Sequence, residues 1–182
     1  MIPTRFHVEN VPTEPFLVIP EVSSERRDYI PIGYLTPDVF ASNKLRVFPG
    51  ATLYHLGVLS SAMHMAWMRY TAGRMKSDYS YSITVVYNNF PWPEAPSQAQ
   101  RQSVGAAAGA VLAARAPHLA AGATLADLYD PLAMPPELVR AHRALDRAVD
   151  RAYRPQPFTT EANRVAFLFD RYEALANPLA VS

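Results

Sequence analysis

The chain has 182 residues, enough for one domain of ordinary size or one domain with a smaller appendage. It contains no cysteine, which excludes disulfides and thiolate metal sites, and its net charge of +1 argues against a uniformly basic nucleic-acid-binding protein. Its 7 glycines form neither of the glycine-rich phosphate-binding motifs, G-x-G-x-x-G or G-x-x-x-x-G-K-[ST].

The N-terminus, M-I-P-T-R-F-H-V-E-N, lacks the basic-then-apolar pattern of a signal peptide. No apolar window reaches the roughly eighteen residues that a membrane-spanning helix needs. We therefore expect a soluble, cytoplasmic protein without a membrane partner.

The residues before Pro96 are rich in aromatic and β-branched side chains and predict a mixed α/β domain over residues 1–95. Most of its expected elements are short and are bounded by proline or glycine. In chain order they are a strand in Phe16–Val22, alternating apolar residues in Ile30–Tyr34, a strand and a second apolar run divided by a Pro49-Gly50 turn in Lys44–Gly57, a helix in Leu59–Gly73 capped by Gly73, and a strand in Ser80–Tyr87 ended by Pro91 and Pro93.

After Pro96 alanine dominates and the period becomes helical, which predicts a small all-helical domain over residues 96–182 and an α+β fold class overall. Between its helices, Thr124–Pro131 reads as a single turn of helix or a loop. The expected helices are Ser97–Arg115, ended by Pro117; Pro135–Tyr153, with Arg140, Arg143, Arg147 and Arg151 away from its apolar stripe; and one that begins at Thr160 as N-cap.

Motifs for catalysis are missing. The histidines form no H-E-x-x-H motif, and no G-x-S-x-G motif surrounds Ser60 or Ser61, which instead read as a helix cap. His64 lies between two methionines on a predicted helix, so a core position is favoured over a catalytic one. The carboxylate pairs have helical spacing typical of solvated pairs, at Asp127 with Asp130 and at Asp146 with Asp150.

A local excess of positive charge favours DNA binding in spite of the small net charge. No acidic residue occurs between Ala41 and Ser77, where aromatic side chains accompany the basic ones. Basic groups on one surface neutralise phosphates and give sequence-independent affinity. The basic residues of this stretch are Lys44, Arg46, Arg69, Arg74 and Lys76.

Lys76 and Asp78 are two residues apart, so both side chains would point to the same side of an extended segment. A lysine donor beside a carboxylate acceptor can address the two partners of one G·C pair. The alternative is an exposed ion pair of little energetic weight. The following "YNNFPWP" reads either as a ligand loop or, as we favour, a rigid exit in which Phe90 and Trp92 pack inward.

Four long motifs together resemble the C-terminal part of MmeI-like DNA methyltransferases, which are single-chain type IIL (type IIG-like) restriction-modification enzymes. The resemblance covers nearly the whole chain. The motifs are "SSERRDYIPIGYL", "ATLYHLGVLSSAMHMAWMR", "GRMKSDYSYSITVVYNNFPWPE" and "LADLYDPLAMPPELVRAHRALDRAVDRAY".

In that family a nuclease domain, a helical spacer and an N6-adenine methyltransferase domain precede a target recognition domain and a helical C-terminal domain. This chain resembles only the last two. The family's Asn-Pro-Pro-Tyr/Phe and S-adenosylmethionine motifs are absent, as is the acidic nuclease motif. The resemblance therefore implies no catalytic, cofactor-binding or metal-binding residue here, with S-adenosylmethionine and Mg²⁺ needed by the complete enzyme.

The resemblance also implies which residues read DNA. Lys76 and Asp78 match a pair that determines specificity at one base pair, in a combination that goes with guanine. The expected function is therefore a sequence-specific recognition module, non-catalytic in this chain, whose partners are double-stranded DNA and the methyltransferase domain of the same enzyme. Further DNA-contact candidates are Lys44, Arg46, Arg69, Arg74, Ser77, Tyr79 and Tyr81.

Two other functions stay open at this point. The chain could be a protein-interaction module that docks on a methyltransferase through its aromatic surface without reading DNA. An independent enzyme is the more remote option, because no catalytic constellation was found.

Overall fold

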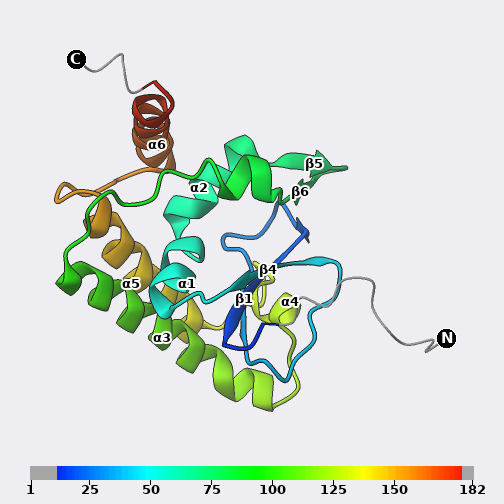
Figure 1. The fold of residues 1–182 in the computed structure, drawn as a ribbon. Helices are drawn as coiled ribbons and strands as arrows, with labels where there is room; N and C mark the ends of the chain where they lie inside the picture. The colour runs from blue at the N-terminus through cyan, green and yellow to red at the C-terminus, as the bar shows by residue number, and fades with distance from the viewer. Residues whose placement is uncertain (1–11, 178–182) are drawn as a thin grey trace.

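A computed structural model describes residues 12–177, so the N-terminal segment, His7 and the outer ends of the two predicted domains lie outside the described residues. Figure 1 shows short strands and helices in the first part and mostly helices in the second. The elements are β1 (Phe16–Pro20), β2 (Val22–Ser23), β3 (Gly33–Leu35), β4 (Leu45–Pro49), α1 (Leu53–Leu59), α2 (Ala62–Thr71), β5 (Gly73–Met75), β6 (Asp78–Ser80), the π-helix η1 (Ile83–Tyr87), α3 (Gln98–Ala120), α4 (Leu125–Leu128), α5 (Pro136–Tyr153) and α6 (Glu161–Ala176).

The strands form two small antiparallel sheets that one segment of the chain connects. The first sheet has the order β3-β1-β4, and the second has the order β2-β6-β5. Glu21 lies between β1 and β2: its N–H donates to the carbonyl of Lys44 at 2.9 Å, and its own carbonyl accepts from the N–H of Tyr81 at 2.8 Å. The predicted single strand in Phe16–Val22 is therefore divided between two sheets.

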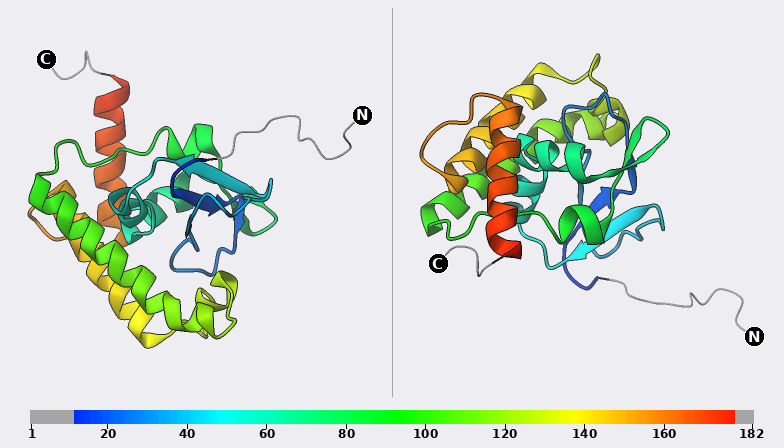
Figure 2. Two further views of the ribbon diagram at one scale, coloured as in Figure 1. Left: turned by 60° about the horizontal axis from the view of Figure 1, so that its bottom comes forward. Right: turned by 90° about the horizontal axis from the view of Figure 1, so that it is seen from above.

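The long helices α3 and α5 lie side by side, as both views in Figure 2 show, and α1 packs on α3. Gly57 permits this close approach. A Cβ at Gly57 would lie 2.6 Å from Cγ1 of Val104 and 3.2 Å from Cδ1 of Leu145. Because both neighbours are fully buried, a larger residue at this position would force the helices apart.

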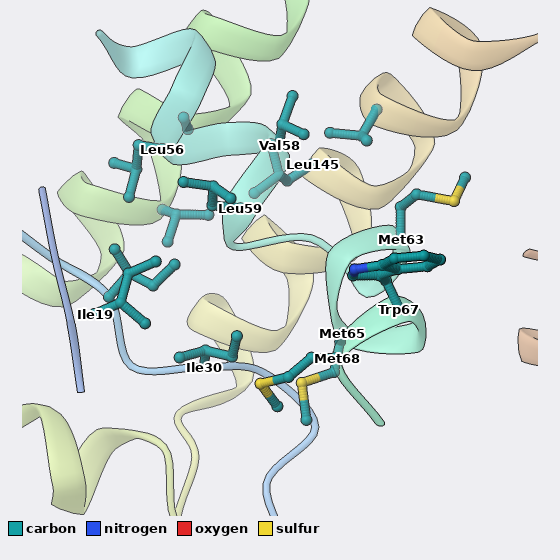
Figure 3. Close-up of a cluster of buried hydrophobic side chains, with 14 of the residues drawn as sticks. Ile19, Ile30, Leu56, Val58, Leu59, Met63, Met65, Trp67, Met68 and Leu145 are labelled. Atoms are coloured by element: carbon teal, nitrogen blue, oxygen red, sulfur yellow. The ribbon is translucent and has the colours of Figure 1, made fainter. Parts of the chain in front are cut away.

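One hydrophobic core extends across the predicted boundary near residue 95. In Figure 3, Leu145 of α5 lies among side chains from the first part of the chain, including Val58 and Leu59. The structure confirms the α+β fold class. It also places the helical part directly against α1 and α2 of the first part.

The predicted strand in Ser80–Tyr87 is wrong beyond Ser80, because this segment forms the π-helix η1. The hydroxyl of Ser82 accepts from the N–H of Val85 and caps η1, and the Trp67 indole N–H donates to the carbonyl of Val86 at 2.9 Å. Val86 is fully buried. Tertiary contacts with α2 thus override the β-propensity of the Ile-Thr-Val-Val run.

Two predicted helix ends are also wrong. Ala72, not Gly73, is the C-cap of α2, and Gly73 begins β5 without a positive φ. The helix α3 continues past Pro117 to Ala120, so Pro117, which removes one intrahelical N–H donor, does not end it. The caps at Ser61 and Thr160 are confirmed, since each side chain accepts from a backbone N–H of its own helix.

A buried polar seam joins the two parts of the chain. The guanidinium of Arg115 on α3 donates to the carbonyl of Ile32 at 2.7 Å and to the hydroxyl of Tyr129 at 2.8 Å. That hydroxyl also lies 2.6 Å from Nε2 of His142 on α5. Tyr29 stacks on the His142 ring, with centroids 4.0 Å apart. These hydrogen bonds and the stacking contact join groups distant in sequence, so they fix how the helices sit on the sheets.

Asp146 of α5 completes this seam. Its carboxylate accepts from the Tyr29 hydroxyl at 2.7 Å and from the N–H of Ala62, the first residue of α2, also at 2.7 Å. Burial raises the pKa of Asp146, although the two hydrogen bonds act against that shift.

Within residues 12–177, no helix combines the length and apolar character needed to cross a bilayer.

Candidate nucleic-acid interface

The stretch that sequence reasoning singled out is a β-hairpin. Strands β5 and β6 pair antiparallel, with Met75 opposite Asp78, so Lys76 and Ser77 form a two-residue turn. Lys76 has φ of 58°, the single positive φ among the described residues other than glycine. A positive φ at the first turn position alone fits a type II′ turn. The premise of an extended backbone at Lys76 is therefore wrong.

The side chains of Lys76 and Asp78 are both accessible at the hairpin end. Lys76 and Ser77 are exposed, and Asp78 is half-buried. No ion pair joins Lys76 to Asp78, so the expected alternative, a surface salt bridge between them, does not form. Oδ1 of Asp78 accepts from the backbone N–H of Glu25 at 3.4 Å, which ties the base of the turn to the segment after β2.

Arg74 lies beside this pair and is held on three sides. Its guanidinium donates to the Ser77 carbonyl at 2.8 Å and to the Glu25 carboxylate at 3.3 Å. It also lies over the Tyr79 ring, 4.0 Å from the centroid. The side chain is nevertheless about half exposed, at 45%. Arg74 is thus placed at the surface in a defined orientation that suits a phosphate or base contact.

Two further candidates, Lys44 and Arg46, flank Glu21. Arg46 donates to the Glu21 carboxylate at 3.1 Å, whereas Nζ of Lys44 lies 3.9 Å from it and its side chain is 79% exposed. Lys44 therefore remains available to an anion. Arg46 is half-buried and is largely committed to Glu21.

Arg69 occupies a structural position. Its guanidinium pairs with Glu161 at the start of α6 and donates to the carbonyl of Arg27 at 3.4 Å. These contacts join α2 to α6 and to the segment after β2. Arg69 is therefore better described as a support of the interface than as a contact with DNA.

Tyr79 and Tyr81 were expected near DNA, but both side chains are buried, at 5% and 2% exposure. Tyr81 places its hydroxyl 3.0 Å from Nε2 of His64. As predicted, His64 is a core residue: it is fully buried, and burial lowers its pKa to about 3. The two tyrosines therefore anchor the hairpin in the core, because their rings supply the apolar area that its exposed tip lacks.

The segment "YNNFPWP" forms a rigid exit from the hairpin region. Phe90 is buried, and the half-buried Trp92 packs against it with ring centroids 5.6 Å apart. The side-chain amide of Asn89 donates to the carbonyls of Thr84 and Val85, both at 3.0 Å, and so caps η1. This agrees with the interpretation favoured from the sequence.

Sequence reasoning missed the role of the segment Ser24–Tyr29. Glu25 binds both Arg74 and Asp78, and Tyr29 binds Asp146 on α5. These partners are 49, 53 and 117 residues away, so no local pattern could reveal them.

Among residues 12–177, no group of three or more histidine, aspartate or glutamate side chains could hold a metal ion.

Comparisons with known proteins agree on one family. Family models described as "MmeI, target recognition domain" and "MmeI, C-terminal domain" match residues 1–94 and 96–180. The chain is 40% identical over 175 residues to DNA methyltransferase A of Bacillus subtilis (strain 168). The matched region covers 96% of this chain and 20% of that protein.

A solved structure of the type IIL restriction-modification enzyme MmeI in complex with DNA is also similar. It has a TM-score of 0.85 and 44% sequence identity, over 92% of this chain and 22% of that chain. The chain thus spans about a fifth of the length of these two relatives.

Proposed function

Because this chain belongs to the MmeI family, as a target recognition domain followed by a C-terminal domain, we propose that it is the DNA-recognition module of a DNA methyltransferase. The observation that carries the proposal is the β5–β6 hairpin. It exposes a cationic donor, Lys76, and a carboxylate acceptor, Asp78, at the end of a structure whose base is buried.

Lys76 and Asp78 are the base-reading residues in this proposal. A lysine can donate to guanine O6 and N7, and an aspartate can accept from the cytosine amino group. No ion pair joins the two side chains, so the Lys76 ammonium and Oδ2 of Asp78 are available to base edges, while Oδ1 accepts from the N–H of Glu25. Arg74 and Lys44 then serve as phosphate contacts, which supply affinity without sequence information.

Methyl transfer is assigned to the parts of the longer enzymes that this chain does not match. We propose that the complete enzyme methylates adenine at N6 with S-adenosylmethionine and that its cleavage activity uses Mg²⁺. The role of this chain is to choose the site, so that the catalytic part can extrude the target base from the duplex.

The decisive experiment exchanges the two charges in the complete enzyme with Lys76→Glu and Asp78→Arg. We expect methylation to move to sites that differ at one base pair, as sequencing of methylated genomic DNA would show. Methylation of the original set of sites by the double variant would refute the base-reading role.

A salt titration tests DNA binding by the chain itself. The affinity for duplex DNA should fall steeply as salt rises, because phosphate contacts release counterions. No binding of any duplex at low salt would instead favour a module that docks on protein alone.

A further inference from the structure

A second basic surface lies on α5 and the loop that leads from α5 into α6, which Figure 2 shows in orange. It is a hollow of about 510 Å³, which we call the arginine pocket. Its lining includes two carboxylates and the buried ring of Phe158. Its five arginines are Arg143, Arg147, Arg151, Arg154 and Arg164.

The carboxylates of the arginine pocket are already committed. Asp150 binds Arg164 through two hydrogen bonds of 3.0 and 2.6 Å, and both side chains are mostly buried. Asp146 accepts from Tyr29 and Ala62 in the seam. Asp150 is thus neutralised by Arg164, whereas Asp146 keeps its charge but forms no salt bridge with an arginine of the pocket, so one acid is left to four arginines within the described residues.

The remaining arginines form a row of positive charge. Arg143, Arg147 and Arg151 follow one another at a spacing of four residues, so they project from one face of α5. Within residues 12–177, neither these three arginines nor Arg154 forms a salt bridge. Like charges at this spacing disfavour the helix slightly. The helix dipole explains a cation in the last turn, such as Arg151, but not Arg143 or Arg147 in the middle.

Arg154 gives the pocket a pre-arranged wall. Its guanidinium lies over the ring of Phe158, 3.7 Å from the ring centroid, and its Nε donates to the carbonyl of Gln156 at 3.2 Å. The orientation is fixed while the terminal N–H groups stay available, which reduces the entropy lost when an anion binds. Planar guanidinium groups in such a row match phosphate oxygens well.

The segment Ser24–Tyr29 connects this pocket to the β5–β6 hairpin. The N–H of Glu25 binds Asp78 of the hairpin, and the hydroxyl of Tyr29 binds Asp146 in the pocket lining. Glu25 and Tyr29 are four positions apart, so their Cα atoms lie at most about 14 Å from each other. One turn of a duplex is about 34 Å long. Arg26, which is exposed, adds a positive charge to this segment.

We propose that the arginine pocket binds the phosphodiester backbone of the same DNA duplex whose bases the hairpin reads. This inference rests on the proposed function and extends it, because it gives the helical part of the chain a direct share in DNA affinity. Arg147 and Arg151 are the principal contacts. Arg154 is the fixed wall of the pocket, and Arg164 keeps Asp150 occupied.

The test uses the full chain and a fluorescently labelled duplex of random sequence, with binding measured by anisotropy at several salt concentrations. The variant carries Arg147→Gln and Arg151→Gln. Each lost phosphate contact should lower the steepness of log K against log salt by about 0.9, so the double variant should lose close to two units. The loss should be equal for every duplex sequence, since phosphates carry no sequence information.

The matched control carries Arg101→Gln and Arg140→Gln, which removes two exposed arginines from α3 and α5 outside the pocket. It should leave the salt dependence unchanged. If the Arg147 and Arg151 variant binds like the control, the pocket proposal is wrong while DNA recognition by the hairpin stands. If the unaltered chain binds no duplex even at the lowest salt, both proposals fail together.

Discussion

The seam between the two parts of the chain buries its polar groups, whereas the β5–β6 hairpin exposes them. In the seam, Arg115 is 2% exposed and shares its donors between Ile32 and Tyr129. In the hairpin, Lys76 is exposed and makes no ion pair with its neighbour Asp78. A buried polar group must keep its partners, because losing one leaves the other unsatisfied. An exposed polar side chain is solvated and can be replaced by another residue.

The difference suggests how such a module can alter its base preference. Residues at the hairpin tip can change without a large effect on folding, since the apolar anchors Tyr79 and Tyr81 lie inside. A single replacement in the seam should instead cost stability, because it leaves a buried partner unsatisfied. Four measurements would break or sharpen this comparison.

The largest effect is expected at the centre of the seam. Arg115→Met removes the donors to the Ile32 carbonyl and the Tyr129 hydroxyl, which stay buried, so the free energy of unfolding should fall by about 3 kcal/mol. Urea unfolding would measure it. Arg101→Met on the same helix is exposed and serves as the control, with an expected change within about 0.5 kcal/mol. Equal losses of unfolding free energy in the two variants would show that the buried seam is no more sensitive to substitution than an exposed position.

The second effect is acid sensitivity of the core and seam. Burial lowers the pKa of both His64 and His142 to about 3, against an ordinary histidine value of about 6.5. The unfolded chain therefore binds more protons between these values, so stability should fall as pH drops from about 6.5 towards 3. Each histidine contributes up to roughly 1.4 kcal/mol per pH unit.

The two histidines can be told apart from Asp146 by the sign of the pH dependence. The raised pKa of Asp146 acts in the opposite direction, because protonation of this acid is easier in the folded state. A urea midpoint that falls as pH drops from about 6.5 to 5 therefore has the sign of the histidines, with a contribution of the same sign from His55, whose pKa burial also lowers. A midpoint that rises as pH drops through this range would contradict the prediction.

A smaller effect is expected at the hairpin turn. Lys76→Asn places a residue that tolerates positive φ at this position, so the free energy of unfolding should rise by about 0.5 kcal/mol. The same variant should lose the preference for guanine at one base pair, because the ammonium donor is gone. Unfolding and duplex competition assays on one preparation would show both changes. A loss of stability would argue against strain at Lys76.

The smallest change in stability is expected for Glu25→Gln, within about 0.5 kcal/mol, because its ion pair with Arg74 is solvated. Release of Arg74 should nevertheless strengthen binding to any duplex and raise the salt dependence by up to about one unit. Glu14→Gln, another exposed acid, is the control for the change in net charge. Identical salt dependence in both variants would mean that Glu25 does not restrain Arg74.

Several features of this chain could be read from local sequence. Ser61 and Thr160 cap their helices by accepting from a nearby N–H, and a short-range pattern is enough to predict this. The core position of His64 followed from its apolar neighbours. Such features depend on groups a few residues apart.

The sequence by itself determined the family, the α+β class and the place of the exposed charged pair, because long motifs and hydrophobic periodicity are properties of contiguous residues. Only the tertiary structure decided that Ile83–Tyr87 is a π-helix, that Tyr81 is buried and that Arg69 supports α6. Each of these depends on a partner from a distant part of the chain, and burial against that partner outweighs local propensity.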